Sequence, residues 1–141
     1  AKLAGFRSKD PNSQVGACIV SEDNKILSMG YNGFPRGCSD DEFPWAREGD
    51  TLDTKYAYVC HSELNAILNF RGGSLEGSKI YVTLFPCNEC AKAIIQAGIK
   101  TVVIPFENKK DIDELEDVVK ENVDIVLAKN MNDVLKVAIV G

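Results

Sequence analysis

The feature that most constrains this chain is a set of three potential metal ligands, His61, Cys87 and Cys90, placed at two predicted helix starts. His61 opens an apolar run with helical periodicity. The two cysteines follow Pro86, a residue suited to the first turn of a helix. One imidazole and two thiolates leave the fourth tetrahedral position of zinc open, as in catalytic sites. The sequence therefore predicts one zinc ion per chain, near helix N-termini that favour thiolate over thiol.

Glu63 lies two residues after His61 and is not needed as a ligand, so it is the candidate general acid and base. Taken alone, each half of the motif has an ordinary alternative, because a lone histidine is often structural and a lone C-x-x-C can be a redox pair. The two halves together, in order and each at a helix start, favour zinc. Cys18, Cys38 and Cys60 are interpreted as small buried apolar residues, since three thiols alone do not close a structural site.

Length and composition fit a single globular domain spanning 1–141, with 45% hydrophobic and 26% charged residues. A net charge of −5 argues against a nucleic-acid polymer as the main partner, because phosphate binding depends on basic surface. The sequence shows no signal peptide and no long apolar run, so we expect no membrane partner and a reducing, cytoplasmic setting.

Hydrophobic periodicity predicts alternating strands and helices. Helices are expected at 1–8, 61–70, 87–97, 111–121 and 131–140, and strands at 15–20, 26–31, 78–84, 101–104 and 123–128. A long connection, 32–58, is rich in Gly, Pro and Asp, and connections of this length are usually functional or mobile. The order predicts an α/β fold with three layers, in which a mixed five-stranded sheet carries helices on both faces and its first two strands are antiparallel.

The pattern H-x-E, then P-C-x-x-C, is similar to the signature of zinc-dependent nucleobase deaminases. From Arg7 to about Val103 the chain more specifically resembles deoxycytidylate (dCMP) deaminases, which have the cytidine deaminase-like fold. The matching runs are 7–17 (RSKDPNSQVGA), 30–33 (GYNG), 37–41 (GCSDD), 61–67 (HSELNAI), 84–92 (LFPCNECAK) and 96–100 (QAGIK).

This resemblance implies hydrolysis of dCMP to dUMP and ammonia, which supplies dUMP for thymidylate synthesis. It implies His61, Cys87 and Cys90 as zinc ligands and Glu63 as the catalytic residue. It makes Asn32 the candidate for holding the sugar, although an Asn-Gly pair is also a common turn. The family's members are commonly homo-oligomers, often hexamers, activated by dCTP and inhibited by dTTP, and a Mg²⁺ ion accompanying such an effector stays open. Phosphate donors are expected among Arg7, Ser8, Lys9, Ser13 and Arg36.

The chain departs from that pattern at Ser62, where the family usually has alanine, and in its short first helix. Its tail, about 97–141, does not follow the family beyond a core of about 1–104, and no tyrosine follows Tyr81. The tail resembles the C-terminal end of Lon-type proteases in the runs 97–105 (AGIKTVVIP), 107–111 (ENKKD) and 131–135 (MNDVL). It is acidic, because 105–141 holds nine acidic and five basic residues, net −4. Protease chemistry is not implied, since no serine follows Ser78.

Two alternatives remain open at this point. One is another deaminase of the same fold, acting on a different cytosine nucleotide or nucleoside or on tRNA adenosine. The other is a zinc-stabilised but inactive binding or assembly module, which the unusual tail makes plausible. The acidic balance argues against tRNA, and the 37–41 run argues for a nucleotide.

Overall fold

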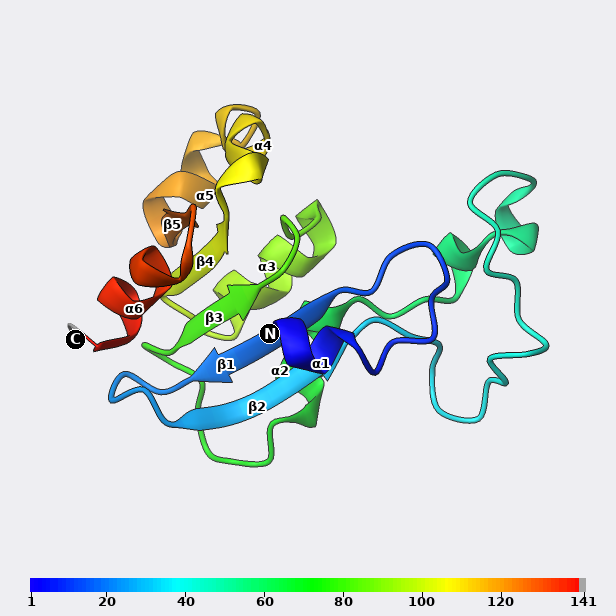
Figure 1. The fold of residues 1–141 in the computed structure, drawn as a ribbon, viewed down its shortest axis with the longest axis horizontal. Helices are drawn as coiled ribbons and strands as arrows, with labels where there is room; N and C mark the ends of the chain where they lie inside the picture. The colour runs from blue at the N-terminus through cyan, green and yellow to red at the C-terminus, as the bar shows by residue number, and fades with distance from the viewer. Residues whose placement is uncertain (140–141) are drawn as a thin grey trace.

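A single mixed sheet organises the computed structural model, which describes residues 1–139. Its strands are β1 (Gly16–Val20), β2 (Ile26–Tyr31), β3 (Lys79–Val82), β4 (Thr101–Pro105) and β5 (Asp124–Ala128), in the order β2-β1-β3-β4-β5. β1 pairs antiparallel with β2 and β3, whereas β3, β4 and β5 run parallel (Figure 1). The predicted five-stranded mixed sheet with an antiparallel first pair is confirmed.

The helices follow the predicted alternation. They are α1 (Lys2–Gly5), α2 (Ser62–Asn69), α3 (Asn88–Gln96), α4 (Lys109–Asp113), α5 (Asp117–Asn122) and α6 (Met131–Ile139), with short 3₁₀ turns η1 (Thr51–Asp53), η2 (Lys55–Ala57) and η3 (Phe106–Asn108). The last predicted helix included Val140, which lies outside the described residues. Among the helices of 1–139, none combines the length and apolarity that crossing a bilayer requires.

One face of the sheet packs on α2 and α3, and this is the main core. Its side chains come from alternate strand positions and from both helices: Ala17, Ile19, Ile80, Val82, Val102, Ile104, Ala66 and Ile94. Burying each valine or isoleucine side chain of this set contributes about 1.5–3 kcal/mol. The opposite side chains, such as Cys18, Tyr81 and Val103, line a groove together with Phe6, Met131 and Val134 from the α1 and α6 regions. Helices thus cover both faces, as predicted.

Close packing at Gly30 of β2 fixes the position of α2. A Cβ at this residue would lie 2.3 Å from Ala66 N and from Ser62 O, both backbone atoms of α2. Glycine therefore allows the first turn of α2, the turn after His61, to lie directly on the strand. The Gly-Tyr-Asn-Gly run consequently has a packing role in addition to any role in binding.

The predicted helix 111–121 is wrong, because the structure has two helices there, α4 and α5. Glu116 has an extended backbone (φ −58°, ψ 142°) and caps α5. A continuous helix would stack Asp113 against Glu116 and Asp117 at spacings of three and four residues, and like charges so placed destabilise a helix. The break relieves this repulsion and still directs Leu115 and Val119 toward the same cavity.

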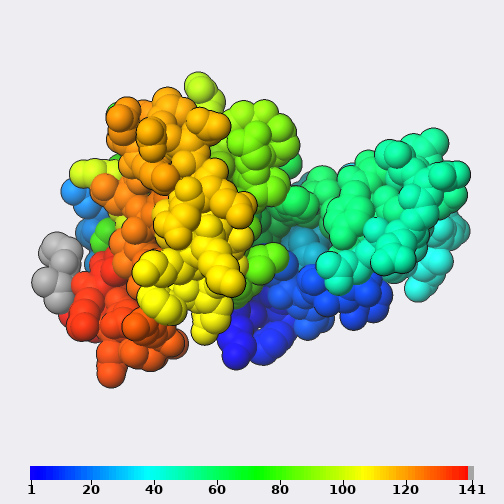
Figure 2. Space-filling model, turned by 90° about the horizontal axis from the view of Figure 1, so that it is seen from above, coloured from blue at the N-terminus to red at the C-terminus, as the bar shows by residue number. Residues whose placement is uncertain are grey.

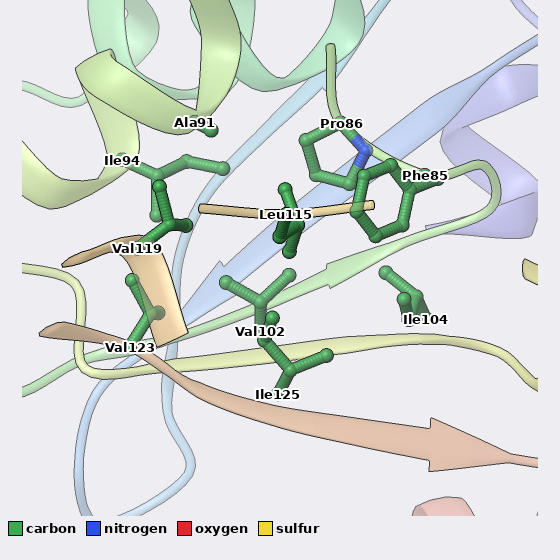
Figure 3. Close-up of a pocket in the computed structure, with 10 residues that line it drawn as sticks. All are labelled: Phe85, Pro86, Ala91, Ile94, Val102, Ile104, Leu115, Val119, Val123 and Ile125. Atoms are coloured by element: carbon green, nitrogen blue, oxygen red, sulfur yellow. The ribbon is translucent and has the colours of Figure 1, made fainter. Parts of the chain in front are cut away.

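That cavity shows how the tail joins the rest of the protein (Figure 3). Four of its lining residues come from the chain after β4: Leu115, Val119, Val123 and Ile125. The others are Phe85, Pro86, Ala91, Ile94 and, in β4, Val102 and Ile104. The part of the tail after β4 therefore packs against α3, β4 and the segment that leads to Cys87.

The long connection 32–58 projects from the body as an arm (Figures 1 and 2). Aromatic side chains pack together inside it. The ring centroids of Phe34 and Trp45 lie 4.0 Å apart, those of Phe34 and Phe43 5.6 Å, and those of Phe43 and Tyr58 5.1 Å. Contacts of this kind contribute about 0.5–1.5 kcal/mol each beyond the area they bury, so the arm has a small apolar centre of its own.

Candidate functional site

The three predicted metal ligands meet where α2 and α3 begin. His61 and Cys87 are the N-cap residues of these helices, and Cys90 lies in the first turn of α3. His61 Nδ1 lies 3.3 Å from Cys87 Sγ and 3.5 Å from Cys90 Sγ. Nitrogen and sulfur donors bound to one tetrahedral zinc lie about 3.6 Å apart, given bond lengths of about 2.0–2.3 Å. The observed spacing therefore fits zinc.

This is the single cluster of at least three potential metal ligands within residues 1–139, and its donor atoms all lie within 4.8 Å of one another. Cys18, Cys38 and Cys60 do not form a second cluster in that part of the chain. Cys18 is buried as predicted, but Cys38 and Cys60 are half-buried, so the interpretation of these two as buried residues is wrong.

The two thiols differ in environment, since Cys90 is buried and Cys87 is exposed. Burial raises the pKa of the Cys90 thiol, and the neighbouring Glu63 and Cys87 raise it further, whereas the backbone amide of Leu64 lowers it. In the chain without metal, burial thus opposes the helix N-terminus, which favours the thiolate of Cys90. Binding zinc has to displace a proton from this sulfur.

Glu63 lies in the first turn of α2, and only 4% of the residue is exposed. The hydroxyl of Ser62, which is fully buried, donates a hydrogen bond of 2.8 Å to Glu63 Oε2. Ser62, the residue that departs from the usual alanine, thus contacts the candidate acid–base group directly. The bond occupies one carboxylate oxygen and limits the rotamers that the side chain can adopt.

A pocket of about 240 Å³ opens beside the ligand cluster. Its lining has three parts. Two metal ligands lie beside the candidate acid–base group: His61, Cys87, Ser62 and Glu63. The apolar wall is Val15, Val59, Leu84 and Phe85, and the polar wall is Asp10, Ser13, Asn32, Arg47, Lys55 and Tyr56. Small-molecule sites commonly combine an apolar wall with a few convergent polar groups. The pocket therefore suits a ligand with a flat ring and a polar substituent.

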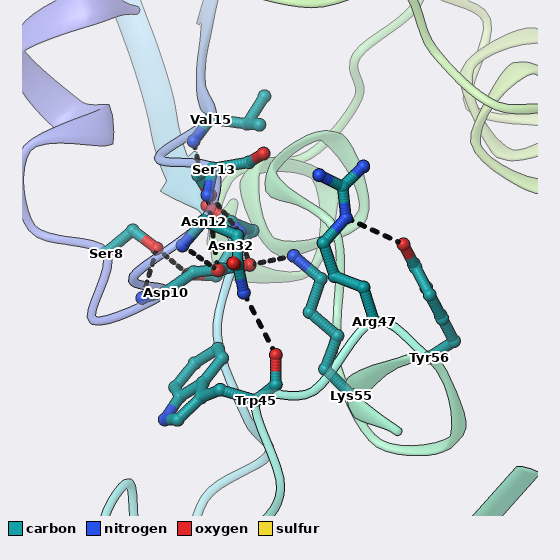
Figure 4. Close-up of polar contacts among 10 residues, drawn as sticks. All are labelled: Ser8, Asp10, Asn12, Ser13, Val15, Asn32, Trp45, Arg47, Lys55 and Tyr56. Carbon is teal, nitrogen blue, oxygen red and sulfur yellow. Dashed lines mark hydrogen bonds and ion pairs between the residues drawn. The ribbon is translucent and has the colours of Figure 1, made fainter. Parts of the chain in front are cut away.

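Lys55 and Asp10 form a buried ion pair in the polar wall (Figure 4), with 7% and 0% of their side chains exposed. Burial alone would raise the pKa of Asp10. The hydrogen bonds from Lys55 and from the amides of Asn12 and Ser13, together with the charge of Lys55, hold this pKa below its ordinary value. The pair joins the arm to the segment before β1.

Asn32, the predicted sugar-binding residue, lines this pocket and is 6% exposed. Its Nδ2 donates to Asp10 Oδ2 (3.2 Å) and to the Ser13 carbonyl (2.9 Å), and its Oδ1 accepts from the Val15 amide (2.8 Å). Both amide protons are therefore committed to the protein, which leaves acceptor capacity on Oδ1 for a ligand.

Of the five expected phosphate donors, Ser13 alone is in the lining of this pocket. Arg7, Lys9 and Arg36 line a neighbouring groove with Phe34 and Cys38. Ser8 is buried and donates a hydrogen bond to the carbonyl of Asn32.

Sequence reasoning missed Asp10, Arg47, Lys55 and Tyr56 as pocket residues. The length of the 32–58 connection was the available signal for the last three. No spacing rule, however, connects Lys55 to a partner 45 residues away.

The fold and the ligand cluster define the class of zinc-binding α/β proteins with cytidine deaminase-like architecture. The sequence-family model described as the cytidine and deoxycytidylate deaminase zinc-binding region matches residues 1–105. The chain belongs to this family. A second model, the C-terminal proteolytic domain of Lon protease, matches residues 83–141. Both resemblances predicted from the sequence are thereby confirmed.

Named relatives agree with this membership. Deoxycytidylate deaminase of Homo sapiens is 61% identical over 115 residues, which cover 81% of this chain and 65% of that protein. Deoxycytidylate deaminase of Enterobacteria phage T4 is 34% identical over 140 residues, covering 73% and 72%. The crystal structure of dCMP deaminase from cyanophage S-TIM5 with dCMP and dUMP superposes with a TM-score of 0.70 at 29% identity, covering 91% and 90% of the two chains. The chain thus spans about two thirds of the length of the human relative.

Proposed function

We propose that this protein hydrolyses the 4-amino group of dCMP, giving dUMP and ammonia. The observation that carries the proposal is that Glu63 lines the same pocket as the metal ligands His61 and Cys87. Named relatives are deoxycytidylate deaminases, and the solved S-TIM5 enzyme holds dCMP and dUMP.

Each group of pocket residues has a separate role in the proposed reaction. His61, Cys87 and Cys90 would hold zinc, which supplies the Lewis acidity that activates a water at neutral pH. Glu63 would take one proton from the water that attacks C4 and pass it to N3 of the cytosine. It would then take the second proton, from the hydroxyl now bonded to C4, and pass it to the amine as the C4–N bond breaks. Ser62 keeps the Glu63 carboxylate in place through its hydrogen bond. Val59, Leu84 and Phe85 form the apolar wall on which the base would lie.

Ultraviolet absorbance tests the proposal, because deamination changes the chromophore of the base. The zinc-loaded protein is incubated with dCMP, CMP, cytidine and dCTP, and we expect turnover of dCMP. Glu63→Gln is nearly isosteric but cannot relay a proton, so its turnover should fall by about 10⁴-fold or more, at the upper end for general acid–base catalysis. Zinc content and folding should stay unchanged. Turnover of none of the four compounds by the wild type would favour the inactive-module alternative.

Further features of the proposal concern assembly and setting. We propose one zinc per chain, supported by the one ligand cluster found within residues 1–139. We also propose a single domain over 1–141, supported by the packing of residues after β4 against α3 and β4. A homo-oligomer is supported by the exposed apolar side chains Leu3, Phe6 and Leu68, and light scattering returning a 15.4 kDa monomer would contradict it. We also propose a reducing, cytoplasmic setting, which would keep Cys87 and Cys90 available as metal ligands. Control by dCTP and dTTP, with Mg²⁺, stays a prediction from the resemblance.

A further inference from the structure

The cationic side chains in the pocket lining differ in whether they already form an ion pair within the protein. Its lining holds two strong cations, Lys55 and Arg47. Lys55 is neutralised by Asp10 inside the protein. Within residues 1–139 no carboxylate lies within salt-bridge distance of Arg47, since the ion pairs found there all involve lysines. Arg47 is therefore the pocket cation that is available to a ligand.

The arm holds Arg47 in a defined place. The Ala46 carbonyl accepts a hydrogen bond of 2.9 Å from the Lys55 amide, and the Trp45 carbonyl accepts one of 3.0 Å from Asn12 Nδ2. These bonds anchor the backbone just before Arg47 to the buried ion pair and to the segment before β1. The position of the arginine consequently depends on the same network that forms the polar wall of the pocket.

The side chain of Arg47 is exposed and makes a hydrogen bond to one neighbouring side chain. Its Nε lies 3.4 Å from Tyr56 Oη, in donor position (Figure 4). Figure 4 shows the two terminal nitrogens directed away from Tyr56. A guanidinium has five N–H donors, so this contact uses one of them and leaves the planar fork that binds phosphate oxygens in pairs.

We propose that Arg47 binds the phosphate monoester of the substrate and makes the enzyme prefer a nucleotide over the nucleoside. The inference rests on the proposed function and adds to it the residue that reads the phosphate. The three cations that were expected from the sequence to bind phosphate line a different groove: Arg7, Lys9 and Arg36. Ser13, at the same polar wall, is positioned to donate a further hydrogen bond.

The test uses zinc-loaded wild type, Arg47→Gln, Arg47→Lys and Arg36→Gln, with Arg71→Gln as a matched control. Arg71 is exposed and donates to the carbonyl of Leu68 at the end of α2, outside the pocket lining. Binding of dUMP and deoxyuridine is measured by titration calorimetry, and kcat/KM for dCMP is measured in parallel. Arg47→Gln should weaken dUMP binding and lower kcat/KM about 10- to 100-fold, as expected for loss of a charge-assisted hydrogen bond.

Deoxyuridine binding, zinc content and the circular dichroism spectrum should be unchanged in Arg47→Gln, and Arg71→Gln should match the wild type throughout. Arg47→Lys should be intermediate, because it keeps the charge and loses the fork. A dUMP affinity in Arg47→Gln within about threefold of that in Arg71→Gln, a range too small for a charge-assisted bond, would overturn the proposal. So would an equal loss for deoxyuridine, or a loss found in Arg36→Gln instead. Because dUMP binding needs no turnover, an inactive wild type would refute the proposed reaction and still leave the role of Arg47 decided.

Discussion

Replacing Lys55 by methionine isolates the energetic role of the buried ion pair. The change keeps most of the aliphatic stem and removes the ammonium group, so Asp10 is left charged with none of its side chain exposed. Asp10 keeps the hydrogen bonds from the amides of Asn12 (2.8 Å) and Ser13 (3.2 Å). These bonds satisfy part of the carboxylate but do not neutralise it.

The expected cost is about 3–5 kcal/mol, the usual result of removing one partner of a buried pair. With a urea m-value of about 2 kcal/mol/M for a small domain, this lowers the unfolding midpoint by about 1.5–2.5 M. Lys92→Met is the matched control, because Lys92 and Glu89 form a pair of 2.7 Å whose side chains are 62% and 77% exposed. Exposed pairs contribute about 0–1 kcal/mol, so its midpoint should hardly move.

Urea denaturation of the zinc-loaded proteins, at equal protein concentration, measures these shifts. The double variant Asp10→Asn/Lys55→Met carries neither charge and keeps an acceptor for the amides of residues 12 and 13. It should therefore be less destabilised than Lys55→Met alone. A midpoint shift in Lys55→Met no larger than that in Lys92→Met would refute the reasoning, since it would mean that water reaches the carboxylate.

The remaining predictions concern the metal, acid stability and the tail. His61→Ala should reduce zinc from about one per chain to near zero and lower the melting temperature to that of chelator-treated wild type, because metal binding and folding are linked; metal analysis and thermal melts check both. The folded pKa of Asp10 is below its ordinary value, so its stabilisation is present above about pH 3.9 and is lost as the pH falls through the folded pKa. The difference in urea stability between wild type and Asp10→Asn should therefore narrow below about pH 4, and a constant difference would contradict this. Leu115→Ala should cost about 1–2 kcal/mol, less than the 2–5 of a fully buried leucine, while Val118→Ala, at a side chain that is 62% exposed, should cost less; equal costs would show that the tail does not pack as described.

Local sequence signals were sufficient for most of the fold and for the metal cluster. The apolar run of β1 and the helix starts at His61 and Pro86 each depend on near neighbours, so they could be recognised from the local sequence alone. The break between α4 and α5 was missed because the apolar stripe at 112, 115 and 119 continues across it. There, charge repulsion and packing in the tail cavity decide the backbone, and periodicity does not.

The polar half of the pocket was not predictable in the same way. Asn32 was identified from its motif, but its hydrogen bonds to Asp10, Ser13 and Val15 depend on how the segment before β1 folds. The Lys55–Asp10 pair joins residues 45 positions apart, and the orientation of Arg47 depends on Tyr56 in the projecting arm. Such long-range polar contacts have no periodicity, so they emerge only in three dimensions.

Strand β4 lies where the two family resemblances of this chain meet. The two family matches overlap at residues 83–105, and β4 ends that overlap. On one side β4 pairs with β3 and on the other with β5, in both cases through parallel backbone hydrogen bonds that do not depend on side-chain identity. A strand of this kind is a natural junction for genetic recombination, because a new crossover segment can be joined there while the sheet edge still accepts its strand. The predicted metal ligands all precede β4, so an exchange of gene fragments at β4 would change the tail and leave this ligand set intact.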